Sequence, residues 1–300
     1  MDENKTPKYY LNKKNILLTI LLTVSFLFLL SYYFILKPYG NGDKIVHIKR
    51  GQSISLVAKE FEDSNIVRDD YILKFFIKIL NRNKGIIPGD YLIKGNSPVF
   101  VVAWQISHGI HKVETIKITI REGLTNKKIA DLLESKLINF DKDLFLNSIS
   151  EKQGYLFPDT YFFFPGDTAL EIIEILSNNF NNKIKDLPIK NSGKNLSEII
   201  TMASILEGEA KGKEDIYIIS GILWKRISIG MPLQVDVDKL TYEVKGLPPN
   251  PINNPGLLSI RSALLPISSS YLYYIHDKEG LVHYAENFEE HKKNIEIYLK

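Results

Sequence analysis

Two glutamates at the end of an otherwise apolar segment are the residues of this chain best suited to do chemistry. Residues 196–210 place apolar side chains, among them Met202 and Leu206, three and four positions apart, which predicts a helix with one buried face. Glu209 continues that face, whereas Glu207 lies roughly 200° around the helix. Burial beside apolar side chains raises the pKa of a carboxyl group, so Glu209 is the better candidate for a general acid.

A structural role is the alternative for both glutamates. Gly208 and Gly212 would end the helix at this point, and the two carboxylates could simply solvate that end. Carboxylates with shifted pKa values also occur in structural networks, so the helix taken alone favours this alternative. At the start of the helix, Ser197 is the predicted N-cap.

Composition sets the outer limits on structure and partners. The chain has 300 residues, 44% of them hydrophobic, which exceeds one average domain and can bury a sizeable core. The net charge is only +3 and the basic residues are scattered, so nucleic acid is not expected as a partner. The chain contains no cysteine, which excludes disulfides, thiol nucleophiles and cysteine-ligated metals and suits an oxidising compartment.

An uncharged run near the N-terminus predicts a membrane span. Residues 15–36 are dominated by Leu, Ile and Phe and are long enough to cross a hydrocarbon core of about 30 Å. Four lysines precede the run, which places the N-terminus in the cytoplasm by the positive-inside rule. The run is too long for a signal peptide and lacks a small-residue cleavage site. We therefore expect a cytoplasmic tail over 1–14, a transmembrane helix over 15–37, and the rest of the chain outside.

A strand-turn-helix pattern occurs twice in the next part of the chain, over 45–61 and again over 116–133. This indicates an internal duplication of a small βα module. The first copy loosely resembles the LysM-type modules that hold peptidoglycan sugars, and a purely structural role is the alternative. We expect 38–144 to hold these LysM-like modules and their linker. The corresponding positions are Gly51 and Gly123, Ser53 and Thr125, Val57 and Ile129, Ala58 and Ala130, and Phe61 and Leu133.

Residues 145–300 read as a mixed domain of helices and short strands, so the fold class expected outside the membrane is α+β. The sequence has no His-Glu-x-x-His or comparable ligand pair, so we expect no metal site and no cofactor. It also lacks the Gly-x-Ser-x-Gly, Ser-x-x-Lys, Walker and Rossmann patterns. What remains is carboxylate chemistry with aromatic and polar neighbours, which favours cleavage of glycosidic bonds.

Several motifs, taken in order and spacing, resemble one family. Together they are similar to the YceG-like endolytic murein transglycosylases, also called MltG proteins. The resemblance covers nearly the whole chain and implies a YceG-like catalytic domain over 145–300. The matching segments are 154–161, 202–210, Arg226 with 229–236, 246–252, and 254–256.

The resemblance implies a membrane-anchored lytic transglycosylase. Such enzymes cleave the β-1,4 bond between N-acetylmuramic acid and N-acetylglucosamine and leave 1,6-anhydromuramic ends, here expected to terminate nascent glycan strands. The catalytic acid of the family is the second glutamate of the Glu-x-Glu motif, which falls on Glu209. One carboxyl group then acts as acid and as base, because the C6 hydroxyl of the sugar replaces the second group that glycosidases usually need.

The same resemblance suggests substrate contacts and partners. Gln234 and Asp236 are candidates for substrate binding, with turn capping as the alternative. Glu207 is expected to orient the site or bind sugar. Asp159 and Tyr161 could line the cleft, although Asp159 is also a natural turn residue, the interpretation we prefer. The implied partners are peptidoglycan glycan strands, the cell (inner) membrane in a single pass, and cell-wall synthases.

Some positions depart from the family pattern. The segment 237–245 is shorter than usual, with Leu240 where an asparagine is typical, and Gln153 stands in place of a glutamate. The segment around His283 lacks a phenylalanine that usually follows the histidine. These changes leave Glu209 in place and raise the alternative that the protein is a non-catalytic peptidoglycan-binding scaffold for cell-wall synthases.

Overall fold

The computed structural model describes residues 13–33, 37–81, 85–138, 140–150, 152–209 and 215–299. The chain divides into two compact units, 1–114 and 115–300, and both combine helices with short antiparallel strands. Helix α1 (Lys13–Ser31) has no buried residue and is, within the described ranges, the one helix long and apolar enough to cross a membrane. It overlaps most of the predicted span over 15–37, of which residues 34–36 lie outside the described part.

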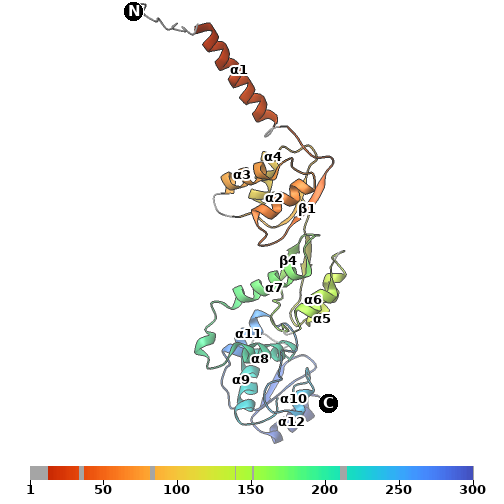
Figure 1. The fold of residues 1–300 in the computed structure, drawn as a ribbon. Coiled ribbons are helices and arrows are strands. Elements are labelled where there is room, and N and C mark those ends of the chain that lie inside the picture. Colours follow the sequence, from red (N-terminus) through yellow and green to blue (C-terminus); the bar gives the residue numbers. More distant parts are fainter. Residues whose placement is uncertain are drawn as a thin grey trace, which may run out of the picture. The chain divides into compact units, whose positions relative to one another are not determined.

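The N-terminal unit has a β-α-α-β order followed by one more helix (Figure 1). Strands β1 and β2 pair antiparallel, with Lys44 opposite Ile93 and Ile48 opposite Gly89. The core between the strands and helices contains Phe61, Leu73 and Tyr91, all fully buried. The elements are β1 (Lys44–Ile48), α2 (Ile54–Asp63), α3 (Asp70–Asn81), β2 (Gly89–Ile93) and α4 (Val99–His108).

The C-terminal unit begins with the same order of elements. Strands β3 and β4 pair antiparallel, and two helices lie between them in the sequence. The first helix of each copy has the same kind of cap: Ser53 Oγ accepts from Leu56 N, and Thr125 Oγ1 accepts from Lys128 N. The predicted duplication thus extends from a strand-turn-helix to a whole β-α-α-β motif. The elements are β3 (Ile116–Thr119), α5 (Asn126–Glu134), α6 (Lys142–Ser148) and β4 (Thr160–Phe163).

The boundary between the two units follows Glu114, whereas the sequence predicts it after residue 144. The physical reason is that β3 finds its strand partner at 160–163. Helix α5 also shares one core with the following helix α7 (Ala169–Ile184), through residues such as Leu133 and Leu176. The second copy of the repeat is therefore part of the C-terminal unit.

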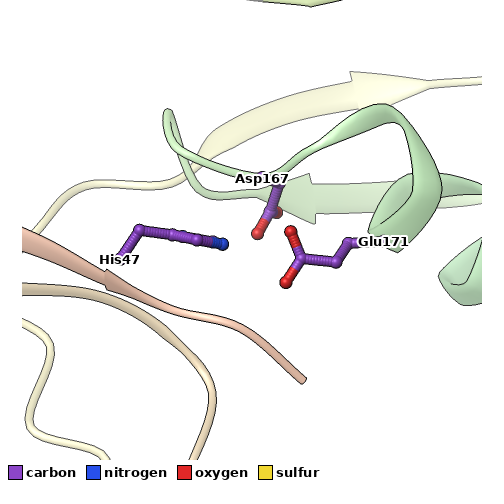
Figure 2. A group of neighbouring side chains, drawn as sticks. All are labelled: His47, Asp167 and Glu171. Atoms are coloured by element: carbon purple, nitrogen blue, oxygen red, sulfur yellow. The ribbon is translucent and has the colours of Figure 1, made fainter. Parts of the chain in front are cut away.

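Helix α7 begins with a capping box. Thr168 Oγ1 accepts from Glu171 N, and Glu171 Oε2 accepts from Thr168 N over 3.0 Å. Asp167 Oδ2 accepts from Phe164 N over 2.7 Å in the turn before the helix. Figure 2 shows the carboxylates of Asp167 and Glu171 next to each other at this helix start, where the N-terminal end of the helix dipole favours negative charge. His47, also drawn there, belongs to the N-terminal unit.

Helix α8 (Leu196–Glu209) is the centre of the remaining part, and all of its residues from Ile199 to Leu206 are buried. It packs against α9 and α11, as Figure 1 shows. Its N-cap is Asn195 rather than the predicted Ser197, because Asn195 Oδ1 accepts from Glu198 N and Glu198 Oε2 accepts from Asn195 N. The other elements are η2 (Ile189–Asn191), α9 (Asp215–Ser228), α10 (Leu240–Glu243), α11 (Leu257–Leu264), β5 (Tyr273–His276), β6 (Val282–Ala285) and α12 (Phe288–Tyr298).

A buried asparagine joins the β-α-α-β part of this unit to the helical part. Asn254 is fully buried in the loop before α11. Its Oδ1 accepts from Gly154 N and Leu156 N, while its Nδ2 donates to Leu124 O and to Asn126 Oδ1, at 2.9 to 3.0 Å. Both polar atoms of the side chain are thereby fully used, and three separate loops are fixed to one another.

Candidate active site

A cavity of about 600 Å³ lies at the C-terminal end of α8, within the C-terminal unit. Its walls come from the end of α8, from α9, from the segment that contains α10, from β5 and from α12. It is lined by Gly208, Glu209, Arg226, Gln234, Asp236, Val237, Tyr242, Tyr273, Tyr274, Ile275, His276, Phe288, His291 and Leu299.

Glu209 is the last residue of α8, and both oxygens of its carboxyl group accept a hydrogen bond. Oε2 accepts from the hydroxyl of Tyr274 over 3.1 Å, and Oε1 accepts from Val237 N over 3.4 Å. Gly208 permits this approach, because a Cβ at that position would lie only 2.5 Å from Val237 Cγ1. The end of the helix and the segment that begins at Val237 therefore need a glycine between them.

Burial is the largest influence on the Glu209 carboxyl and raises its pKa. The hydrogen bonds from Tyr274 and Val237 act in the opposite direction, and the negative charge of Asp236 raises the pKa further. The net result is a raised pKa, which keeps more of the group protonated than in an exposed glutamate. That is the property a general acid needs near neutral pH.

Asp236 supplies a second carboxylate on the same cavity. Its Oδ1 accepts from the hydroxyl of Tyr242, on α10, over 2.7 Å. The short segment 237–245 is fixed by the buried Thr241, whose Oγ1 accepts from Val235 N over 3.0 Å, and by a bridge between Pro232 and Lys245. Although this segment is short, it still builds one wall of the cavity.

The structure separates the predicted site residues into two groups. Glu209, Gln234 and Asp236 line one cavity. Glu207 points elsewhere: its Oε2 accepts from Gly256 N over 2.8 Å and from Ser259 Oγ over 2.7 Å. This carboxylate therefore anchors the start of α11 to α8, and the predicted difference in facing between the two glutamates is confirmed.

Asp159 and Tyr161 lie around β4 and do not line the cavity. Asp159 Oδ1 accepts from Thr160 N over 2.8 Å, and its Oδ2 lies 3.1 Å from Lys183 Nζ. The buried Tyr161 donates its hydroxyl hydrogen to Phe157 O over 2.6 Å. These contacts agree with the turn role preferred for Asp159 and give Tyr161 a role in packing.

Sequence reasoning gave no role to several residues of the cavity. Tyr274 lies within a strand predicted over 271–276, and Arg226 belongs to one of the motifs that resemble the family, but neither carries a signal that it would face Glu209 or its cavity. His291 and Tyr273 are brought there by α12 and β5, whose position depends on long-range packing. The adjacent Tyr273 and Tyr274 in a tyrosine-rich strand near the C-terminus are the signal that could have suggested an aromatic wall.

Comparison with known protein families matches residues 46–238 and 240–297 to the YceG-like family. One similar protein is the endolytic murein transglycosylase of Bacillus subtilis (strain 168), 25% identical over 88% of this chain and 88% of the relative. The endolytic murein transglycosylase of Streptococcus pneumoniae (strain ATCC BAA-255 / R6) is 29% identical over 48% of this chain and 31% of the relative.

Among solved structures, the 2.6 Å crystal structure of the YceG-like protein lmo1499 from Listeria monocytogenes is 25% identical in sequence, with a TM-score of 0.53. That likeness covers 85% of this chain and 99% of the other. Since the family match takes in most of both units, including α8 and every residue that lines the cavity except Leu299, this chain belongs to the YceG-like family.

Proposed function

We propose that this protein is an endolytic peptidoglycan lytic transglycosylase that cleaves the β-1,4 bond between N-acetylmuramic acid and N-acetylglucosamine. The observation that carries the proposal is Glu209, a carboxyl group with a raised pKa on the wall of a cavity with polar and aromatic walls. The names of the relatives in Bacillus subtilis and Streptococcus pneumoniae support the same reaction. Tyrosines and polar side chains on the cavity wall suit a sugar polymer.

Glu209 then acts first as an acid and next as a base. The protonated carboxyl gives its proton to the glycosidic oxygen as the bond from that oxygen to C1 breaks. The C6 hydroxyl oxygen of the muramic acid bonds to C1, and its proton passes to the Glu209 carboxylate. The product is a 1,6-anhydro ring, and no water is consumed. The donors on Glu209, Tyr274 and Val237 N, stabilise the carboxylate that exists between the two proton transfers.

In this proposal, α1 anchors the enzyme in the cell membrane in a single pass, with the N-terminus in the cytoplasm and both folded units outside. The apolar character of α1 supports the anchor, and the lysines before it support the orientation. The LysM-like β-α-α-β motifs would hold glycan strands near the membrane. The enzyme would there terminate nascent strands beside cell-wall synthases.

Digestion of purified sacculi tests the reaction. The full-length protein in detergent should release fragments whose muramic ends are lighter by one water than hydrated reducing ends. Glu209→Gln should reduce the release by about a hundredfold or more, as expected for loss of a general acid. Glu279→Gln, an exposed change in the turn between β5 and β6 and outside the cavity wall, is the matched control and should be as active as the wild type.

Two other results would contradict the proposal. Hydrated ends would identify a hydrolase, in which Asp236 would be the candidate to activate water. Binding to sacculi without any released fragment, and equal binding by Glu209→Gln, would identify a non-catalytic scaffold.

A further inference from the structure

Arg226, on α9, is a buried cation on the wall of the same cavity as Glu209. Its side chain is only 5% exposed. Removing a guanidinium from water costs free energy unless charged or polar partners replace the water. In the described part of the chain no carboxylate forms an ion pair with Arg226. Its positive charge is therefore not neutralised by the protein residues that the structure describes.

The guanidinium is nevertheless held in a fixed orientation. Nε donates to Leu272 O over 2.7 Å, and Nη1 donates to Leu233 O. The guanidinium also lies over the ring of Tyr273, 5.1 Å from its centroid. These contacts use two of the five N–H groups, and for Nη2 the described residues provide no hydrogen-bond acceptor. The remaining donors are thus held in place beside the cavity.

His291 adds a second unused polar atom at the same place. Its ring stacks on the ring of Tyr273, with centroids 5.0 Å apart and planes 27° apart. Its Nδ1 is buried, and no described residue forms a hydrogen bond with it. Burial and, to a smaller extent, the charge of Arg226 lower the pKa of His291, which favours the neutral ring over a competing positive charge. Arg226 and His291 therefore both contact the ring of Tyr273.

We propose that Arg226, with His291 beside it, is an anion-binding subsite that takes a carboxylate carried by the muramic acid part of the glycan. A fixed guanidinium with free N–H groups matches the two oxygens of a carboxylate. The carboxylate can come from the lactyl group of peptide-free strands or from the peptide attached to it. This inference rests on the proposed function. A guanidinium that only ties Leu233 to Leu272 is the structural alternative.

Binding of defined oligosaccharides to the full-length Glu209→Gln protein, which cannot turn them over, tests the subsite. The probes are a peptide-free oligosaccharide of alternating N-acetylglucosamine and N-acetylmuramic acid with free lactyl carboxylates, its methyl ester, and the same oligosaccharide carrying the stem peptide. A charge-assisted hydrogen bond predicts that the free acid binds about tenfold to a hundredfold more tightly than the ester. Equal affinities for all three probes would overturn the proposal.

The peptide-bearing probe identifies the source of the carboxylate. If it matches the free acid, the peptide supplies the group; if it matches the ester, the lactyl group does. Adding Arg226→Gln should abolish the preference for the acid. Lys225→Gln is the control: it removes one positive charge from the same helix, lies outside the cavity wall and should keep the preference. If Arg226→Gln does not fold, the comparison of the three probes on the protein that keeps Arg226 still decides.

The subsite and the proposed reaction can fail separately. Release of anhydro ends by the wild type, together with equal binding of all three probes, would retain the enzyme and reject the subsite. A strong preference for the acid without any released fragment would retain an anion-binding cavity and reject the transglycosylase.

Discussion

The hydroxyl of Tyr274 donates a hydrogen bond to Glu209 Oε2 over 3.1 Å, across 65 positions of sequence. Burial strongly raises the pKa of Tyr274, so its hydroxyl keeps its hydrogen and acts as a donor. The bond favours the carboxylate form of Glu209, while burial favours the protonated form. The pKa of Glu209 is therefore determined by two opposing effects. The one that lowers it includes the hydrogen bond from a single atom, the hydroxyl oxygen of Tyr274.

Tyr274→Phe removes that atom and should move the pH dependence of cleavage. Without the donor the pKa of Glu209 rises further, so activity should persist to higher pH before it declines. The maximal rate should fall about tenfold, because the carboxylate formed during the reaction loses a charge-assisted hydrogen bond. Rates of fragment release from sacculi across pH measure both effects. Tyr271→Phe changes a ring outside the cavity wall and should leave the pH dependence of cleavage unchanged. If the activity of Tyr274→Phe declines at the same pH as that of the wild type, the assignment of Glu209 as the acid is contradicted.

Glu209→Gln should also change how stability depends on pH. A carboxyl whose pKa is higher in the folded state stabilises the fold fully below its unfolded pKa, and that contribution is lost as pH rises through the folded pKa. Glutamine has no such loss. The variant should therefore gain stability relative to the wild type as pH rises toward neutrality, a difference that denaturant midpoints at acidic and neutral pH will reveal. A gap between the two proteins that does not vary with pH would contradict the raised pKa.

The local part of this site could be predicted from sequence. The spacing of Met202, Leu206 and Glu209 fixes which carboxylate shares the apolar face of α8, and the structure places Glu209 on the cavity and Glu207 away from it. The N-cap is Asn195 and not the predicted Ser197, although Asn195 and Glu198 carry the spacing of a capping box. Short-range rules are therefore sufficient to find this helix start.

The distant part of the site could not be predicted from sequence. Tyr274 and Arg226 reach the cavity because β5 and α9 pack beside the end of α8, and no local periodicity encodes that packing. Tyr161 illustrates the reverse case, since an aromatic segment that resembled a cleft wall is used to fill the interior. Residue type indicates what a side chain can do, whereas tertiary contacts decide where it does it.

Glu207→Ala should destabilise the protein far more than it slows the chemistry. Gly256, the N-cap of α11, has no side chain that could cap the helix. Glu207 supplies the missing acceptor to Gly256 N and to Ser259 Oγ. Its loss leaves two poorly solvated donors and should lower the free energy of unfolding by about 1–3 kcal/mol.

Chemical denaturation measures this effect, with Glu296→Ala on the exposed side of α12 as the control that should change little. Glu207→Gln keeps one acceptor oxygen and should lose less. A Glu207→Ala protein as stable as the wild type but unable to cleave sacculi would instead indicate a chemical role for this carboxylate.

Asn254→Ala should be among the most destabilising single changes in the C-terminal unit. The side chain satisfies two backbone N–H groups, one backbone carbonyl and Asn126 Oδ1, all in a fully buried place. Leaving them unpaired should cost about 3 kcal/mol or more. Asn254→Asp should also destabilise, since it sets an acceptor where Nδ2 now donates. Thermal unfolding checks both, and Asn250→Ala at an exposed position should stay within about 0.5 kcal/mol of the wild type.

Gln234 allows backbone and side-chain contributions to be separated at the cavity wall. Its φ of +52° lies in the left-handed region, which glycine adopts readily and a β-branched residue resists. Gln234→Gly should keep or raise the free energy of unfolding, by up to about 1 kcal/mol, and Gln234→Val should lower it by about 1–2 kcal/mol. If the glutamine amide contacts the glycan, both variants should need more substrate to reach half-maximal rate, whatever their stability.

The matched control for Gln234→Gly is Asn96→Gly in the N-terminal unit, which has a φ of +70° and lies outside the cavity. It makes the same kind of backbone change without altering the cavity wall, so it should leave cleavage unchanged. Unfolding curves and the substrate dependence of fragment release, measured on the same preparations, separate the two effects. Full activity in a stable Gln234→Gly protein would contradict a contact between the Gln234 side chain and the substrate. Gln234 would then act only through its backbone, as a turn residue with a positive φ.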